Sequence, residues 1–158
     1  MGRLLAPSLA VPGAAVVRSD ALRKQLMGAE LTQRLGPEGY SAEATERTYQ
    51  ALLDTSAAVL RAGHAVIADG VFARPEQRAA IAQVAADAGV RFDGLWLETA
   101  PEVAAARIGA RIGDASDATV AVLERQRSYA LGEIGWHRLD TGRPQDDALI
   151  TALHVLGV

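Results

Sequence analysis

The sequence predicts an α/β domain in which a parallel sheet lies between two layers of helices. Two observations indicate this fold class. Short apolar runs of strand length alternate with longer segments of helical periodicity, and turns that contain Gly or Pro separate them. This alternation is typical of a parallel sheet that helices cover on both faces. The 158 residues fit one domain, so we predict a single unit over residues 1–158.

Four apolar runs predict the strands, and each run ends at a polar residue. The predicted strands cover residues 14–17, 64–68, 95–97 and 136–139. A Pro12-Gly13 turn precedes the first of them. The carboxyl ends of parallel strands lie at one edge of a sheet, which is where ligands bind in open α/β folds.

Capping residues and apolar stripes predict the helices between these strands. Ser41 is an N-cap for a long helix, and Gly63 stands where a helix-ending glycine belongs. Thr99 and Glu102 match a capping box. The predicted helices run over residues 21–27, from Ser41 to Gly63, from Pro75 to Gly89, from Thr99 through Arg111, onward from Ser116 or Asp117, and from Gln145 to Leu156.

Composition and charge exclude several classes of protein. The formal net charge is −3 and no basic tract is present, so we expect no duplex nucleic acid as a partner. The chain has no cysteine, which excludes disulfides and thiolate metal sites. No apolar run approaches the roughly 20 residues of a membrane span. We therefore expect no membrane partner and a cytoplasmic protein.

Two aspartates follow predicted strands. Asp20 comes after the strand over residues 14–17, and Asp69 comes after the strand over residues 64–68. A carboxylate at the carboxyl end of a parallel strand can accept a proton from a hydroxyl group or bind Mg²⁺. Each aspartate could instead cap the helix that follows it. Because two of them stand at equivalent strand ends, we favour the catalytic interpretation.

Arginines follow the same strand ends. Arg23 lies one helical turn beyond the first strand-end aspartate, and two further pairs are spaced by one turn: Arg74 with Arg78, and Arg107 with Arg111. Forked guanidinium groups suit phosphate oxygens. The alternative is that each pair lies on a solvated helix face. Since all three groups come after the carboxyl end of a predicted strand, we favour phosphate binding.

Three segments together resemble a known family. They are Val16-Val17-Arg18-Ser19-Asp20-Ala21-Leu22-Arg23-Lys24, Val66-Ile67-Ala68-Asp69-Gly70, and Arg107-x-x-x-Arg111-x-Gly113-Asp114-Ala115-Ser116-Asp117. This pattern resembles the P-loop kinases and ATPases of the polynucleotide-kinase-like and zeta-toxin-like group. It is most similar to the ATP-binding half of bifunctional aminoglycoside-phosphotransferase-like proteins, from about Ala6 to Thr141. The resemblance implies a P-loop NTPase-like sheet, ATP and Mg²⁺ as cofactors, and phosphoryl transfer to a small-molecule acceptor.

The resemblance also implies roles for individual residues. Asp20 would be the general base that accepts the proton of the acceptor hydroxyl. Asp69 would lie near Mg²⁺ and the γ-phosphate, and residues 113–126 would form the lid and the segment directly after it. For the remaining candidates, Arg23 and Arg74 would contact the acceptor, Arg107 and Arg111 the transferring phosphates, and Asp140 and Thr141 the adenine end of the nucleotide.

The phosphate-binding motif of this family, G-x-x-x-x-G-K-[ST], does not occur in the sequence. The one lysine, Lys24, follows Arg23 instead. We therefore expect the loop and the strand before it to lie upstream of Met1 in a longer chain, and we expect this chain to bind ATP weakly or not at all. Alternatively, this chain could be a genuine member of the family that has lost the loop. Two other functions stay open, a non-catalytic binding module completed by a partner's strand and a nucleotide hydrolase.

Overall fold

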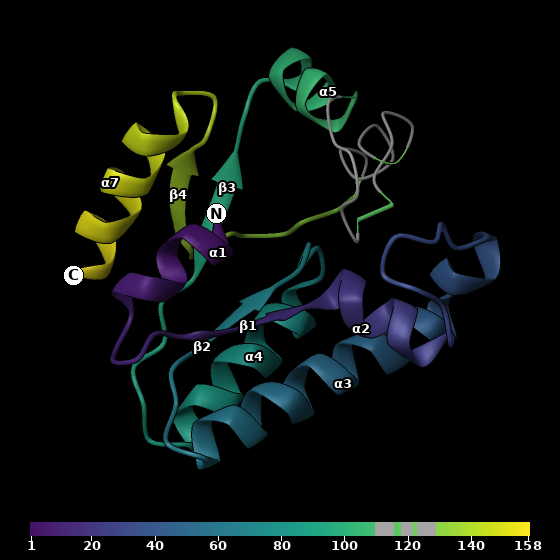
Figure 1. Ribbon diagram of the computed structural model, residues 1–158, viewed down its shortest axis with the longest axis horizontal. Coiled ribbons are helices and arrows are strands. Elements are labelled where there is room, and N and C mark those ends of the chain that lie inside the picture. Colours follow the sequence, from purple (N-terminus) through teal and green to yellow (C-terminus); the bar gives the residue numbers. More distant parts are fainter. Residues whose placement is uncertain (110–115, 118–121, 123–128) are drawn as a thin grey trace.

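Short strands alternate with helices along the chain in the computed structural model (Figure 1), which confirms the predicted α/β class. The structure describes residues 1–109, 116–117, 122 and 129–158. Its strands are β1 (Ala15–Arg18), β2 (Val66–Asp69), β3 (Leu95–Glu98) and β4 (His137–Asp140). Its helices are α1 (Gly2–Leu5), α2 (Ser19–Leu26), α3 (Ala42–Arg61), α4 (Pro75–Asp87), α5 (Pro101–Gly109) and α7 (Gln145–Leu156), with short 3₁₀ turns η1 (Ala6–Ser8) and η2 (Pro37–Tyr40). No helix in this described part is long and apolar enough to span a membrane.

The strands form two parallel pairs, whereas the sequence predicts one sheet. β1 pairs with β2 in register from Ala15–Val66 to Arg18–Asp69, and β3 pairs with β4 from Leu95–His137 to Glu98–Asp140. Among the described residues, no ladder of hydrogen bonds joins β2 to β3. The two pairs are therefore connected by the packing of side chains.

Helix α1 packs where the two strand pairs meet. Its Leu5 is buried and forms one apolar cluster with Leu139 of β4 and Leu156 of α7. Ile67 of β2 and Leu95 of β3 pack against the same cluster. Full burial of side chains of this size is favourable by about 1.5–3 kcal/mol each. This cluster can therefore hold the two pairs together without backbone pairing between them.

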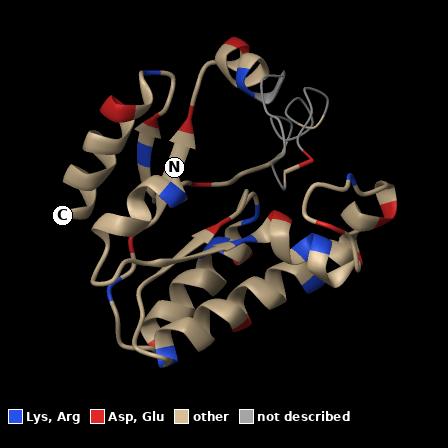
Figure 2. Ribbon diagram, viewed as in Figure 1, with Lys and Arg blue, Asp and Glu red and all other residues tan. Residues whose placement is uncertain are grey.

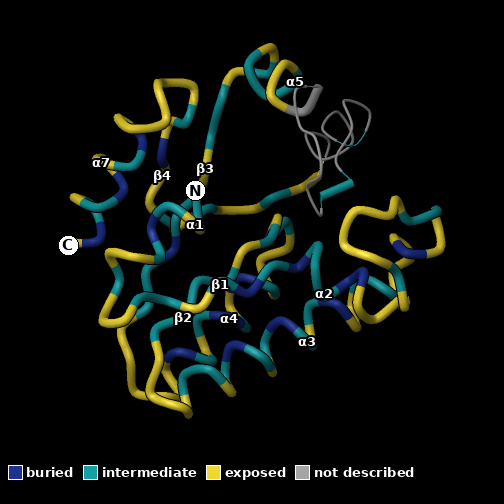
Figure 3. Tube along the Cα trace, in the orientation of Figure 1, coloured by how far each residue is buried: buried dark blue, intermediate teal, exposed yellow. Residues whose placement is uncertain are grey.

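A second apolar cluster lies between the β1–β2 pair and helices α3 and α4. Its buried members are Val17, Leu52, Phe72 and Ile81. Figure 3 shows buried residues recurring along α3, as expected for a helix with one covered face. The predicted N-cap of this helix is confirmed, because the Ser41 Oγ accepts a hydrogen bond from the Ala44 N–H at 3.1 Å.

The carboxyl ends of β1 and β2 lie side by side at one edge of their pair. Their last residues, Arg18 and Asp69, are register partners. Helix α2 starts directly after β1 at Ser19. The chain that leaves β2 passes Gly70, where a Cβ atom would lie 3.2 Å from the Ser19 Oγ. This close approach brings the start of α2, which contains Asp20, against the loop that follows Asp69.

Candidate functional site

Acidic and basic residues lie close together along the ribbon where β1 passes into α2 (Figure 2). The Nε of Arg18 lies 3.3 Å from the Oδ2 of Asp69, and the two side chains are 18% and 50% exposed. Asp20, in the first turn of α2, interacts electrostatically with both groups. The two strand-end aspartates therefore lie in one cluster. Their catalytic roles stay predictions.

Burial raises the pKa of the Asp20 carboxyl above its usual value. A hydrogen bond with the Ser116 side chain and the charges of Arg18 and Arg23 lower this pKa, and the charge of Asp69 raises it, but burial has the largest effect. A carboxylate whose pKa lies above the normal range is a better proton acceptor than an exposed one. Asp20 is therefore suited to take a proton from a hydroxyl group placed beside it.

Asp20→Asn is expected to stabilise the fold at neutral pH. Since the pKa of Asp20 is higher in the folded chain than its ordinary value of 3.8, the ionised carboxyl disfavours the folded state. This cost is present above the folded pKa and disappears as pH falls toward 3.8. Urea denaturation should show the variant to be more stable than the wild type near neutral pH, with the difference lost below the unfolded pKa. Equal stability near neutral pH would contradict the effect of burial.

Arg23 is buried beneath the η2 turn. Its Nη1 donates to the Gly39 carbonyl oxygen at 2.7 Å and to the Thr45 Oγ1 at 3.4 Å, and its Cζ lies 4.9 Å from the centroid of the Tyr40 ring. Its Nε is a buried donor that has no hydrogen-bond partner among the described residues. Arg23 thus holds the η2 turn and the start of α3 against α2. Its contact with an acceptor stays a prediction.

The two arginines after β2 have different surroundings. Arg74 is exposed at the start of α4, so its predicted contact with the substrate stays open. Arg78 is buried, and its guanidinium group donates to backbone carbonyl oxygens. The acceptors are Phe72 and Ala73 for Nη1, at 2.8 and 3.0 Å, and Leu131 and Glu133 for Nη2, at 2.5 and 3.1 Å. Arg78 is therefore neither free to bind a phosphate nor part of a solvated helix face. It holds the β2–α4 loop to residues 131–133.

Other predicted residues gather at the carboxyl ends of β3 and β4. Arg107 of α5 donates from Nη1 to the Thr141 carbonyl oxygen at 2.6 Å. The N–H and the hydroxyl of Thr141 both donate to the Glu98 carbonyl oxygen, at 2.7 and 2.9 Å. Asp140 accepts a hydrogen bond from the Gly142 N–H at 2.8 Å. Arg107, Asp140 and Thr141 therefore form one group on the β3–β4 pair, whereas the strand-end aspartates lie on the β1–β2 pair.

Two residues that the sequence assigns to a loop or a helix cap contact side chains of α2. Ser116 hydrogen-bonds Asp20, and the Asp117 carboxylate accepts hydrogen bonds from the Lys24 Nζ and the Tyr40 hydroxyl. Their membership of the Gly-Asp-Ala-Ser-Asp motif is the one sequence signal for this position. Arg111 and most of residues 113–126 lie outside the described residues.

The resemblance implies Mg²⁺ at the Asp69 carboxylate, whose Oδ2 lies 3.3 Å from the Arg18 Nε and would have to exchange this ion pair for the metal. Among the described residues, no group of three or more His, Cys, Asp or Glu side chains is placed to hold a metal ion. Mg²⁺, however, is commonly bound through one or two carboxylates, with waters and substrate phosphates as the other ligands. The half-exposed Asp69, at a strand end beside Asp20, suits this mode of binding. Phosphate oxygens would have to complete the site.

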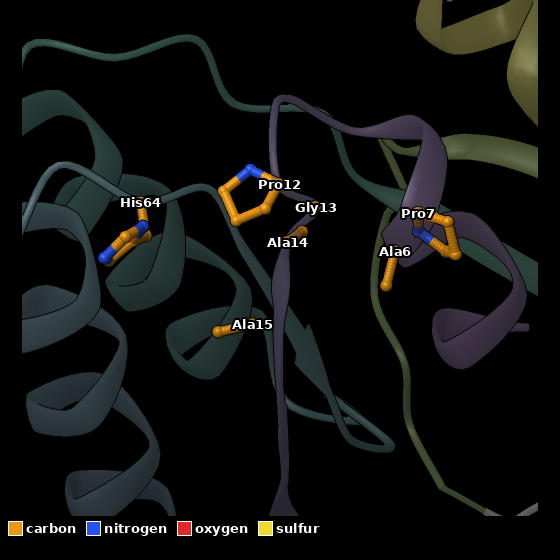
Figure 4. A pocket seen from close by; sticks show the side chains of 7 residues that line it. All are labelled: Ala6, Pro7, Pro12, Gly13, Ala14, Ala15 and His64. Atoms are coloured by element: carbon orange, nitrogen blue, oxygen red, sulfur yellow. The ribbon is translucent and has the colours of Figure 1, made fainter.

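An open hollow of about 340 Å³ lies at the opposite, amino-terminal ends of β1 and β2 (Figure 4). Its lining residues are Ala6, Pro7, Pro12, Gly13, Ala14, Ala15 and His64. The lining offers no carboxylate and no guanidinium group, and so lacks the groups that phosphate chemistry needs. The candidate site is the carboxyl edge of the strands, where the carboxylates and guanidinium groups lie.

Parallel strands flanked by helices make this chain an α/β domain with charged groups at the carboxyl ends of its strands. The family model described as AAA domain matches residues 4–131. The chain therefore belongs to this family. The match covers β1, β2, β3 and both strand-end aspartates, but not β4.

Curated relatives and a solved structure are also similar to this chain. An uncharacterized protein of Mycobacterium bovis and two of Mycobacterium tuberculosis are each 31% identical over 90% of the chain. The chain spans 30% of the length of these relatives. A crystal structure of an unliganded sugar kinase from Janibacter sp. HTCC2649 matches with a TM-score of 0.67 and 18% identity, covering 99% of this chain and 86% of that one. This likeness shows the fold alone.

Proposed function

We propose that this chain is the catalytic part of an ATP-dependent phosphotransferase that acts on a hydroxyl group of a small molecule. The observation that carries the proposal is Asp20, a carboxyl group with a raised pKa at the carboxyl end of a parallel strand, beside Asp69. Phosphoryl transfer depends on a positioned acceptor and on stabilisation of charge. A carboxylate that accepts the proton of the hydroxyl group is a recurring part of such sites. Membership of the AAA domain family supports a nucleotide as the donor.

Each charged group has one task in this proposal. Asp20 accepts the proton of the acceptor hydroxyl while the new O–P bond forms and the bond to the leaving phosphate breaks. Asp69 would hold the metal ion, and Arg107 and Arg111 would contact the phosphates. Bound ATP would supply the phosphoryl group and bound Mg²⁺ would offset its charge. Arg23 and Arg74 would contact the acceptor, and Asp140 and Thr141 would lie toward the adenine end. Since Arg107 donates to the Thr141 carbonyl oxygen at 2.6 Å, it would have to leave Thr141 to reach the phosphates.

The 158-residue chain is expected to bind ATP weakly, with a Kd of about 1 mM or above, which corresponds to about 4 kcal/mol or less. The sequence has no G-x-x-x-x-G-K-[ST] motif to surround the phosphates. Its one lysine, Lys24, is buried and paired with Asp117. Titration calorimetry with ATP and Mg²⁺ measures the affinity, and the same titration with adenosine shows how much of it the phosphates contribute. A Kd in the micromolar range would contradict this expectation.

A binding module without catalysis is the second candidate, and the break between β2 and β3 favours it. Within the described part of the chain, each of these strands has a ladder partner on one side only. An extended segment of another protein can pair with such an edge. A folded monomer that forms no ADP with any hydroxyl acceptor, even when a phosphate-binding loop is added upstream, would favour this candidate. A nucleotide hydrolase, the third candidate, would release inorganic phosphate without a phosphorylated acceptor.

A further inference from the structure

Asp117 joins parts of the chain that lie far apart in sequence. Its Oδ1 lies 2.9 Å from the Lys24 Nζ, and its Oδ2 accepts hydrogen bonds from the Leu35 N–H at 3.0 Å and the Tyr40 hydroxyl at 2.7 Å. Burial alone would raise the pKa of Asp117, but hydrogen bonds from these three residues lower it below its usual value. Asp117 is therefore an ionised carboxylate at the centre of a cluster with Lys24, Leu35 and Tyr40, the Asp117 cluster.

Lys24 stabilises the Asp117 cluster, because its ammonium group is buried and paired with the Asp117 carboxylate. The Lys24 side chain is 1% exposed and the Asp117 side chain is 9% exposed. A buried ammonium group that loses its counter-charge is strongly destabilising. The Lys24 Nζ also donates to the Leu31 carbonyl oxygen at 2.9 Å. The segment over residues 31–40 is therefore fixed at three points, by Lys24 at Leu31 and by Asp117 at Leu35 and Tyr40.

The Asp117 cluster reaches Asp20 by two routes. Ser116, the residue directly before Asp117, hydrogen-bonds the Asp20 carboxyl. The Tyr40 ring centroid lies 4.9 Å from the Arg23 Cζ, and Arg23 follows Asp20 by one turn of α2. Asp117 is therefore linked to Asp20 through Ser116, and to Arg23 through Tyr40.

We propose that Asp117 is a positioning residue that holds Ser116 on Asp20 and Tyr40 on Arg23. These side chains are then already in place around the base when the acceptor binds. The proposal rests on the phosphotransferase function proposed above. Asp117 acts through Ser116 and Tyr40 and is not itself a catalytic residue. Side chains that are fixed before the acceptor arrives lose less conformational entropy on binding, and they orient the hydroxyl group for transfer.

Asp117→Asn in the full 158-residue chain tests this role by amide hydrogen exchange. Losing one hydrogen bond to a charged group shifts a local opening equilibrium by about ten- to a hundredfold. Exchange in residues 29–40 is therefore expected to accelerate by about this factor, while the amides of α7 keep their wild-type rates. Asp87→Asn, on the exposed side of α4, is the matched control and should change neither segment.

Two further variants keep the test decisive if Asp117→Asn unfolds because the Lys24 charge loses its partner. Lys24→Met combined with Asp117→Asn removes both charges, and Tyr40→Phe removes one hydrogen bond. Both are expected to accelerate exchange in residues 29–40. The NMR contact between Ser116 and Asp20 should disappear in the double variant and persist in Tyr40→Phe. A role in stability alone would leave this contact in place.

The outcomes separate a positioning role from a structural one. Faster exchange throughout the chain with an intact Ser116–Asp20 contact would overturn the proposal, and so would unchanged exchange in residues 29–40. In assays of ADP formation with a chain extended upstream of Met1 by an apolar strand and a G-x-x-x-x-G-K-[ST] loop, loss of Asp117 should raise the acceptor KM and leave the ATP KM unchanged; a rise in the ATP KM alone would contradict the proposal. If this extended chain forms no ADP with any acceptor, the proposed function fails, and the exchange rates and the Ser116–Asp20 contact still decide the role of Asp117.

Discussion

Asp20→Asn should lower the turnover of an active form of this chain by about 100- to 10,000-fold. An asparagine keeps the size of the side chain and can still hydrogen-bond Ser116, but its amide cannot accept the proton of an acceptor hydroxyl. The sequence itself has no phosphate-binding motif. ADP formation should therefore be measured in a chain extended upstream of Met1 by an apolar strand and a G-x-x-x-x-G-K-[ST] loop.

Two comparisons separate the loss of a base from the loss of the fold. Asp54→Asn changes an exposed carboxylate on α3 that hydrogen-bonds Gln50, and it should retain full turnover. Asp20→Asn is itself expected to be the more stable protein near neutral pH, because burial raises the pKa of Asp20. A slower but more stable enzyme would identify Asp20 as a residue at which stability is given up for function. Turnover within about tenfold of the wild type would remove Asp20 from the role of base.

The edge of the fold that carries Asp20 can be predicted from the sequence alone. Each predicted strand is a short apolar run, and the polar residue after the run marks where the strand ends. In a parallel arrangement these ends meet at one edge, so Asp20 and Asp69 are expected to be neighbours. The ion pair between Arg18 and Asp69 depends in addition on the register of β1 and β2, which the apolar runs do not determine.

The burial of Arg78 and Lys24 could not be predicted from the sequence. Helical spacing indicates which residues share a face, but it does not indicate whether that face is covered. Arg74 and Arg78 are one turn apart, yet the first is exposed and the second is buried, because carbonyl groups 53 and 55 positions away accept hydrogen bonds from Arg78. Lys24 is paired with Asp117, 93 positions away. Such contacts arise from tertiary packing, which periodicity does not encode.

The break between β2 and β3 has a similar explanation. Alternating strands and helices predict parallel strands, but the pattern does not specify which strand edges hydrogen-bond each other. In the structure, Leu5 of α1 shares an apolar cluster with Ile67 and Leu95, so side chains connect the two pairs. A connection of this kind leaves no signature in the pattern of strands and helices.

Arg78→Met is expected to lower the free energy of unfolding by about 3–5 kcal/mol. Arg78 is 6% exposed and donates to the carbonyl oxygens of four residues. A methionine fills much of the same space but leaves these oxygens without their donor. One of them belongs to Phe72, whose φ of 46° lies in the left-handed region. A backbone strained in this way persists only where its surroundings hold it, and the bond from the Arg78 Nη1 is one of the contacts that do so.

Urea denaturation of matched variants measures the effect of the Arg78 side chain. Arg74→Met changes the exposed arginine one turn earlier on the same stretch of chain and should alter stability by less than about 0.5 kcal/mol. Arg78→Lys keeps the charge, but one ammonium group cannot span both pairs of carbonyl oxygens, so an intermediate loss is expected. A loss below about 1 kcal/mol for Arg78→Met would show that other contacts suffice to hold the β2–α4 loop. A large loss at Arg78 with none at Arg74 would instead establish that two arginines with helical spacing have separate roles. One would then hold the loop beside Asp69, and the other would remain available to a phosphate or an acceptor.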